Sequence, residues 1–238
     1  MPARSVRLAF ARRALTVALA GLIGLGGVDC SAFASSGYDG ILDGTLSGSV
    51  RATASLDQVM LGATGTYIDR VLAERDSTLE RWPDRLGQPL RVWIDSSDAL
   101  TGAQAGFPAA VRFAFDQWMS TGIPVRLAYV TSERGANIRV RWTEYLNRKT
   151  GSTTWRTDRA GYLTGGEITL ATHVSDGQPL DARGMRAIAL HEVGHALGLS
   201  HSLDGRDVMA SLVRVDGLSE SDRGTLKLLY SLPAGHVR

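Results

Sequence analysis

Three histidines and a glutamate occur at a spacing that can bind a metal ion and act on a water molecule. His191 and His195 stand four residues apart, so on a helix they lie on one face and can bind one ion together. Glu192 lies beside the first of them, where its carboxylate can reach a metal-bound water without binding the metal itself. Gly198 tolerates a positive φ, so the chain can leave the helix sharply and bring back His201 as a third ligand.

Zinc is the metal that this set of side chains favours. Three imidazoles leave a tetrahedral zinc with one open position for water, which is the arrangement of a catalytic site rather than a structural one. The chain has five histidines, and three of them fall within the eleven residues 191–201. Scattered surface histidines on a helix would not be expected to show this spacing. We therefore predict one catalytic zinc, bound by His191, His195 and His201.

The pattern H-E-x-x-H-x-x-G-x-x-H resembles the long zinc signature of the metzincin metallopeptidases. Ser202 directly follows the third histidine, which is similar to the matrixin branch (matrix-metalloproteinase-like enzymes) rather than to the astacins or serralysins. Met209 resembles the methionine of the family's Met-turn. Astacins and serralysins carry an assisting tyrosine two residues later, and Ser211 at that position again resembles the matrixins.

Similarity to matrixins extends over about residues 86–230. Residues 115–118 resemble a matrixin helix motif, and residues 136–140 resemble a matrixin strand in which Asn137 replaces the usual aspartate. Residues 218–230 are similar to the family's C-terminal helix.

The resemblance implies an α+β fold of the metzincin, or zincin-like, type: a twisted mixed sheet of about five strands with an active-site helix and a C-terminal helix. It implies a secreted zinc metalloendopeptidase in which Glu192 is the general base for a zinc-bound water and Met209 forms an apolar floor beneath the zinc. An extended protein or peptide substrate would pair with an edge strand, which we place at Gly166, Ile168 and Leu170.

Two other functions remain open. The chain could be a zinc-containing peptide-binding module without turnover, although such a module does not need the carboxylate of Glu192. It could also be a metallohydrolase of non-peptide substrates, which only the family resemblance disfavours.

The resemblance also raises two further metal sites, one for calcium and one for a second zinc. The matrixin region that matches residues 151–161 is a loop that binds structural ions, so Asp158 is a candidate calcium ligand, although a solvated loop acid is the favoured interpretation. Matrixins carry histidine ligands of a second zinc near His173. Such a site needs four ligands and only His236 is left over, so we interpret His173 as a surface or supporting histidine.

The N-terminus predicts export. Four arginines precede an apolar run that is too short for a membrane span, and Ala32-Phe33-Ala34 fits a cleavage site, so residues 1–34 are predicted to be a signal peptide. Alternatives are a lipoprotein anchored through Cys30 and a twin-arginine signal. Residues 35–85 are predicted to be an extension, and residues 86–238 the metallopeptidase domain.

Charge and cysteine content limit the partners. The formal net charge is +2, but the first 34 residues carry a net of +3, so the remainder carries −1 and no basic patch indicates nucleic acid. Cys30 is the only cysteine, which excludes an intrachain disulfide. We expect a monomer.

Periodicity predicts the secondary structure around the motif. Residues 35–65 are typical of a linker, residues 66–82 of a helix, and the polar residues 151–161 of a loop. Further strands are expected at 90–94, 125–130, 138–142 and 167–172, and further helices at 108–121, 183–199 and after an N-cap at Ser219.

The sequence leaves open whether residues 35–85 keep the enzyme inactive until they are removed. Many matrixins resemble one another in a prosegment whose cysteine thiolate blocks the zinc, and this chain has no cysteine after Cys30. We expect the enzyme to be active once folded and exported. The alternative is an inhibitory prosegment in which an oxygen ligand, for which Asp84 is a candidate, covers the zinc.

Overall fold

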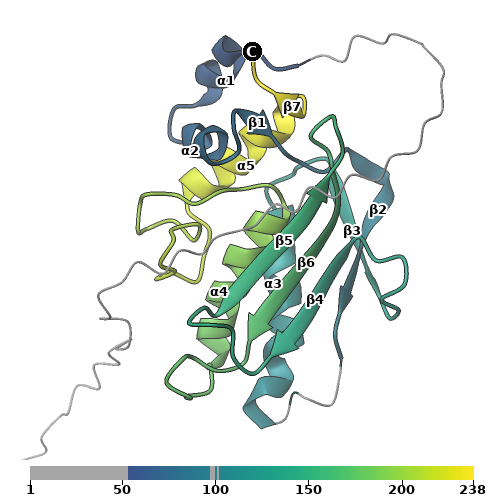
Figure 1. Ribbon diagram of the computed structural model, residues 1–238, viewed down its shortest axis with the longest axis vertical. Coiled ribbons are helices and arrows are strands. Elements are labelled where there is room, and N and C mark those ends of the chain that lie inside the picture. Colours follow the sequence, from purple (N-terminus) through teal and green to yellow (C-terminus); the bar gives the residue numbers. More distant parts are fainter. Residues whose placement is uncertain (1–52, 97–99, 101) are drawn as a thin grey trace, which may run out of the picture.

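The computed structural model describes residues 53–96, 100 and 102–238 of the chain. Within this part, five strands form a mixed sheet in the order β3-β2-β4-β6-β5, and helices α3 and α4 pack against each other on one face of it (Figure 1). The elements of this layer are β2 (Arg85–Ile94), the 3-10 helix η1 (Gly102–Gly106), α3 (Phe107–Met119), β3 (Val125–Val130), β4 (Ile138–Thr143), β5 (Gly151–Thr157), β6 (Leu163–Ala171) and α4 (Ala182–Ala196). The predicted α+β fold is confirmed.

Strand direction changes once across the sheet. Strands β3, β2, β4 and β6 run parallel, and β5 pairs antiparallel with β6. Helix α3 connects β2 to β3, a loop connects β3 to β4, and β5, which forms a hairpin with β6, connects β4 to β6. Among the described residues β5 therefore lies at one edge of the sheet and β3 at the other.

This order corrects the predicted edge strand. Gly166, Ile168 and Leu170 lie on β6, which has neighbours on both sides, and they pair with Trp155, Thr153 and Gly151 of β5. The prediction is one strand too far inward because the polar residues 151–157 were interpreted as a loop. Polar alternation is what an edge strand shows when only one of its faces is buried, and Gly151, Thr153 and Trp155 are indeed its buried residues.

The two large helices are joined through buried aromatic residues. Phe107, Phe115 and Trp118 of α3 are fully buried. The indole N–H of Trp118 donates to the carbonyl of Leu190 in α4 at 2.8 Å. This bond and the surrounding apolar contacts fix α4 under the sheet, with its residues 188–196 almost entirely buried.

Local capping sets where the helices begin. Asp181 caps α4 by accepting from the amide of Gly184 at 2.6 Å. Ser219 caps the last helix, α5 (Glu220–Ser231), through a capping box with Asp222, which confirms the predicted N-cap. The prediction that the active-site helix reaches residue 199 is wrong, because α4 ends at Ala196 before the turn at Gly198.

Residues 54–84, called here the N-terminal segment, form a compact unit with the C-terminus. The segment contains α1 (Leu56–Gly62), α2 (Ile68–Glu74) and β1 (Thr78–Leu79), and β1 pairs antiparallel with β7 (Gly235–His236). These elements and α5 gather at one end of the molecule, with the C-terminus beside α1 (Figure 1).

Two predictions within this segment are wrong. The predicted helix over 66–82 stops at Glu74, because Asp76 and Ser77 adopt positive φ angles of 48° and 56° and start a turn into β1. The described end of the predicted linker contains helix α1, whose Val59 belongs to the same hydrophobic core as the sheet.

No helix in the described residues is long and apolar enough to cross a membrane. The predicted signal peptide, residues 1–34, lies outside the described residues, and so do residues 35–52 of the linker predicted over 35–65.

Candidate metal centre

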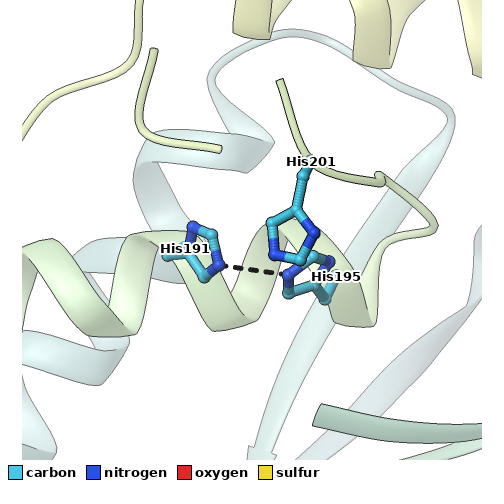
Figure 2. A group of neighbouring side chains, drawn as sticks. All are labelled: His191, His195 and His201. Carbon is cyan, nitrogen blue, oxygen red and sulfur yellow. Dashed lines mark hydrogen bonds between the residues drawn. The ribbon is translucent and has the colours of Figure 1, made fainter. Parts of the chain in front are cut away.

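The three histidines of the motif converge on one point. His191 and His195 extend from the same face of α4, and His201 comes from the loop that follows it (Figure 2). One nitrogen from each ring lies within 4.8 Å of the others, and the Nε2 atoms of His191 and His195 are 3.1 Å apart. Among the described residues, these three histidines form a group of possible ligands that could hold a metal ion.

Hydrogen bonds at Nδ1 orient the two helical histidines. The carbonyl of Val208 accepts from Nδ1 of His191 at 2.8 Å, and the carbonyl of Leu199 accepts from Nδ1 of His195 at 2.9 Å. An imidazole that donates from Nδ1 carries its lone pair on Nε2, the atom that faces the centre of the group. Both tautomers are therefore fixed by backbone groups in the form that binds a metal.

Burial keeps these imidazoles neutral. The side chains of His191 and His195 are buried, and removal from water lowers the pKa of His191 to about 4 and that of His195 well below its usual value. Three imidazole nitrogens that converge in a largely buried site are the donor set that zinc accepts, so the residues fit this metal.

Glu192 lies against the edge strand. Its carboxylate accepts from the hydroxyl of Thr153 at 2.7 Å, and the same hydroxyl lies 3.0 Å from the carbonyl of Glu192. A Cβ at Gly151 would overlap the carboxylate, so only glycine fits there. Burial raises the pKa of Glu192 to about 7, against the opposing effects of the Thr153 bond and the charge of Lys149.

The predicted Met-turn lies beneath the helix. Met209 is fully buried and its sulfur packs so closely against Gly194 that a Cβ there would overlap it. The turn is held by Asp222, whose carboxylate accepts from the amide of Val208 at 2.9 Å and that of Met209 at 3.4 Å. Because the carbonyl of Val208 orients His191, Asp222 supports a metal ligand through the turn.

The glycine of the motif makes the turn that returns His201. Gly198 has a φ of +104°, a conformation that L-residues with side chains rarely adopt. A Cβ at this position would also overlap the carbonyl oxygen of Glu80 in the N-terminal segment. Both the backbone conformation of the turn and the packing against Glu80 therefore require glycine at position 198.

Sequence reasoning missed the residues that surround His201. Glu74 of α2 accepts from the amide of His201 at 3.3 Å, and Arg75 donates to the carbonyl of Leu199 at 3.2 Å. Asp84, our candidate for covering the zinc, forms an ion pair with Arg81 at 3.0 Å instead. No motif marks Glu74 or Arg75, because both act across more than 120 residues of sequence.

His173 and Asp158 do not belong to this group of potential ligands and have local partners. Nδ1 of His173 is 2.9 Å from the hydroxyl of Thr172. The carboxylate of Asp158 accepts from the amides of Ala160 and Tyr162 at 2.8 and 3.0 Å and so closes the turn between β5 and β6.

The comparison with family models agrees with this geometry. Residues 94–231, more than half of the chain, match the model of the matrixin peptidases. The chain belongs to the matrixin family. Membership supports a zinc metallopeptidase, a hydrolase that acts on protein or peptide substrates, and the cluster of His191, His195 and His201 fits zinc binding. A comparison with curated proteins found no match.

Proposed function

We propose that the chain is a secreted zinc-dependent endopeptidase in which Glu192 is the general base. The observation that carries this proposal is that Glu192, the residue after His191, holds its carboxylate against the edge strand β5. Its carboxylate is buried and held by Thr153, and its neighbour in sequence, His191, is one of the three ligands. A structural zinc site would need a fourth protein ligand and no such carboxylate.

The chain's own residues would bind the metal and move the proton. His191, His195 and His201 would hold the zinc, which would supply Lewis-acid polarisation of the substrate carbonyl and lower the pKa of a water. Glu192 accepts a proton from that water and later gives it to the leaving amine. The bond from Thr153 keeps the carboxylate directed while these protons move.

The substrate would lie along β5. This strand is at the edge of the sheet among the described residues, and its Thr153 contacts Glu192. An extended peptide that adds to this edge brings its backbone past the histidine cluster, and main-chain hydrogen bonds would hold it in register. This assignment replaces the one that we made for β6.

Cleavage of a peptide library by the purified, zinc-loaded protein tests the proposal. We expect internal peptide bonds to be cut and a chelator to abolish the cleavage until zinc is restored. Tight binding of peptides without cleavage would favour the non-enzymatic zinc module. Hydrolysis of small esters or amides with no cleavage of peptides would favour a metallohydrolase of other substrates.

Export is the second part of the proposal. The arginine-rich start, the apolar run and Ala32-Phe33-Ala34 support a mature chain that begins at or near Ser35. N-terminal sequencing of the exported protein checks this, and a chain that begins with a lipid-modified Cys30 would show that the protein is a lipoprotein.

A further inference from the structure

We propose that Glu74 is a positioning residue for the third histidine, His201, and that the N-terminal segment carrying it stays in the active enzyme. The proposal rests on the proposed function, because it assigns a role in the same metal centre. It differs from the prosegment alternative, in which this part of the chain would cover the zinc and be removed.

Glu74 contacts His201 at two points with one oxygen. Its Oε2 accepts from the backbone amide of His201 at 3.3 Å and lies 3.8 Å from Nδ1 of the ring. The second distance is too long for a direct hydrogen bond, so the effect on the ring is electrostatic. Its Oε1 accepts from Arg70 at 3.2 Å, an ion pair one turn earlier on α2.

This contact gives the third histidine the kind of support that the other two obtain from the backbone. His191 and His195 donate from Nδ1 to the carbonyls of Val208 and Leu199. A carboxylate on the Nδ1 side of His201 favours the tautomer with its proton on Nδ1, which leaves Nε2 to bind the metal. It also stabilises the positive charge that the imidazole gains when it binds a cation.

The next residue supports the same loop. The guanidinium of Arg75 donates to the carbonyl of Leu199 and to the hydroxyl of Ser200, each at 3.2 Å, and it forms an ion pair with Glu80. Leu199 is the residue whose carbonyl orients His195. The end of α2 therefore contacts the backbone between the second and third ligands as well as the third ligand itself.

The segment that carries Glu74 is built into the fold. The carbonyl of Ala54 accepts from the amide of Arg238 at 3.1 Å, and the carbonyl of Arg238 accepts from the amide of Leu56 at 2.8 Å. At the other end, the indole N–H of Trp82 donates to the carbonyl of Ala196, within the motif, at 2.8 Å, and Trp82 is fully buried. Removal of the segment would expose this core and break both sets of bonds.

Glu74 does not lie where an inhibitory ligand would. The group of potential ligands that converge within 4.8 Å in the described residues consists of the three histidines and does not include this carboxylate. The matrixin match begins at residue 94, so the support from Glu74 comes from a part of this chain that the family model does not cover.

Zinc affinity of the full mature chain tests the role of Glu74. Glu74→Ala should weaken zinc binding about 10- to 100-fold in competition with a chelator, since outer partners of metal ligands typically contribute this much. Glu74→Gln keeps an oxygen for the amide of His201 and should recover part of the loss. Arg70→Gln is the matched control, because it removes the other partner of Glu74 and should change zinc affinity less than about threefold.

A spectroscopic measurement separates positioning from general stability. With cobalt in place of zinc, Glu74→Ala should shift the visible absorption bands of the metal, whereas Arg70→Gln should leave them unchanged. Equal zinc affinity of the wild type and Glu74→Ala would overturn the proposal. An equal loss of zinc affinity in Glu74→Ala and Arg70→Gln would also overturn it. If the wild type itself bound no zinc, the proposed function would be wrong and not only this inference.

The mass of the active protein tests the second part. Active protein recovered from the medium should retain all of residues 54–84. Activity that appears only after cleavage within or after this segment, with the segment released, would overturn the proposal.

Discussion

Replacement of Asp222 by alanine should destabilise the protein strongly, while replacement by asparagine should not. Asp222 is fully buried and accepts from the amides of Val208 and Ser219, each at 2.9 Å, and from the hydroxyl of Tyr67 at 3.0 Å. Alanine leaves these three donors without a partner. At about 1–3 kcal/mol for each buried unsatisfied group, and with partial rescue by water, the free energy of unfolding should fall by about 3–6 kcal/mol.

Asparagine can keep most of this network. Its oxygen can take the place of Oδ2 and accept from Val208 and Ser219, while its NH₂ group donates to Tyr67, whose hydroxyl can also accept. Only the longer bond from Met209, at 3.4 Å, is lost. We therefore expect Asp222→Asn to lie within about 1 kcal/mol of the wild type at neutral pH.

The wild type and the asparagine variant should also differ in their dependence on pH. Burial raises the pKa of Asp222 in the folded state, so the native protein binds this proton more tightly than the unfolded chain does. Relative to Asp222→Asn, the free energy of unfolding of the wild type is then highest below the unfolded pKa of about 3.9, and it declines as pH rises through the folded pKa.

Urea unfolding followed by tryptophan fluorescence measures these differences. All samples must contain the same free zinc concentration, since a metal that binds only the folded state adds to stability. A loss below about 1 kcal/mol in Asp222→Ala would refute the reasoning from unsatisfied donors. An equal loss in the alanine and asparagine variants would show that the charge matters and the acceptor geometry does not.

Three further variants probe the contacts around the motif. Thr153→Val removes the hydroxyl that holds Glu192 and should lower kcat about tenfold without a change in zinc content, measured by peptide cleavage and elemental analysis. Gly194→Ala places a Cβ into the sulfur of Met209 and should lower the free energy of unfolding by about 1–3 kcal/mol. Gly205→Ala, whose Cβ would have no atom within 4 Å, should have little effect and serves as its control in the same unfolding assay.

The sequence was sufficient where function depends on local spacing. His191 and His195 are ligands because of helical periodicity, and Gly198 makes the turn because of its backbone freedom, so the site could be predicted from eleven residues. Ser219 could be predicted as an N-cap for the same reason, since capping depends on a few neighbouring residues.

The sequence was insufficient where function depends on tertiary contacts. Residues 151–157 were taken for a loop because their polarity hides a strand with one buried face. Glu74 and Arg75 carry no signal, because a charged residue at the end of a short helix is ordinarily solvated and its partner here lies more than 120 residues away. The break of the predicted helix at Asp76 and Ser77 likewise depends on the packing of β1 against β7.

Zinc content and peptide cleavage, measured together in the wild type, His195→Ala and Glu192→Ala, test the central claim most directly. The wild type should hold one zinc per chain at the histidine cluster and cleave peptides. His195→Ala should lose both the zinc and the activity, whereas Glu192→Ala should keep the zinc and lose activity by orders of magnitude. Full zinc in His195→Ala, or undiminished cleavage in Glu192→Ala, would contradict the account.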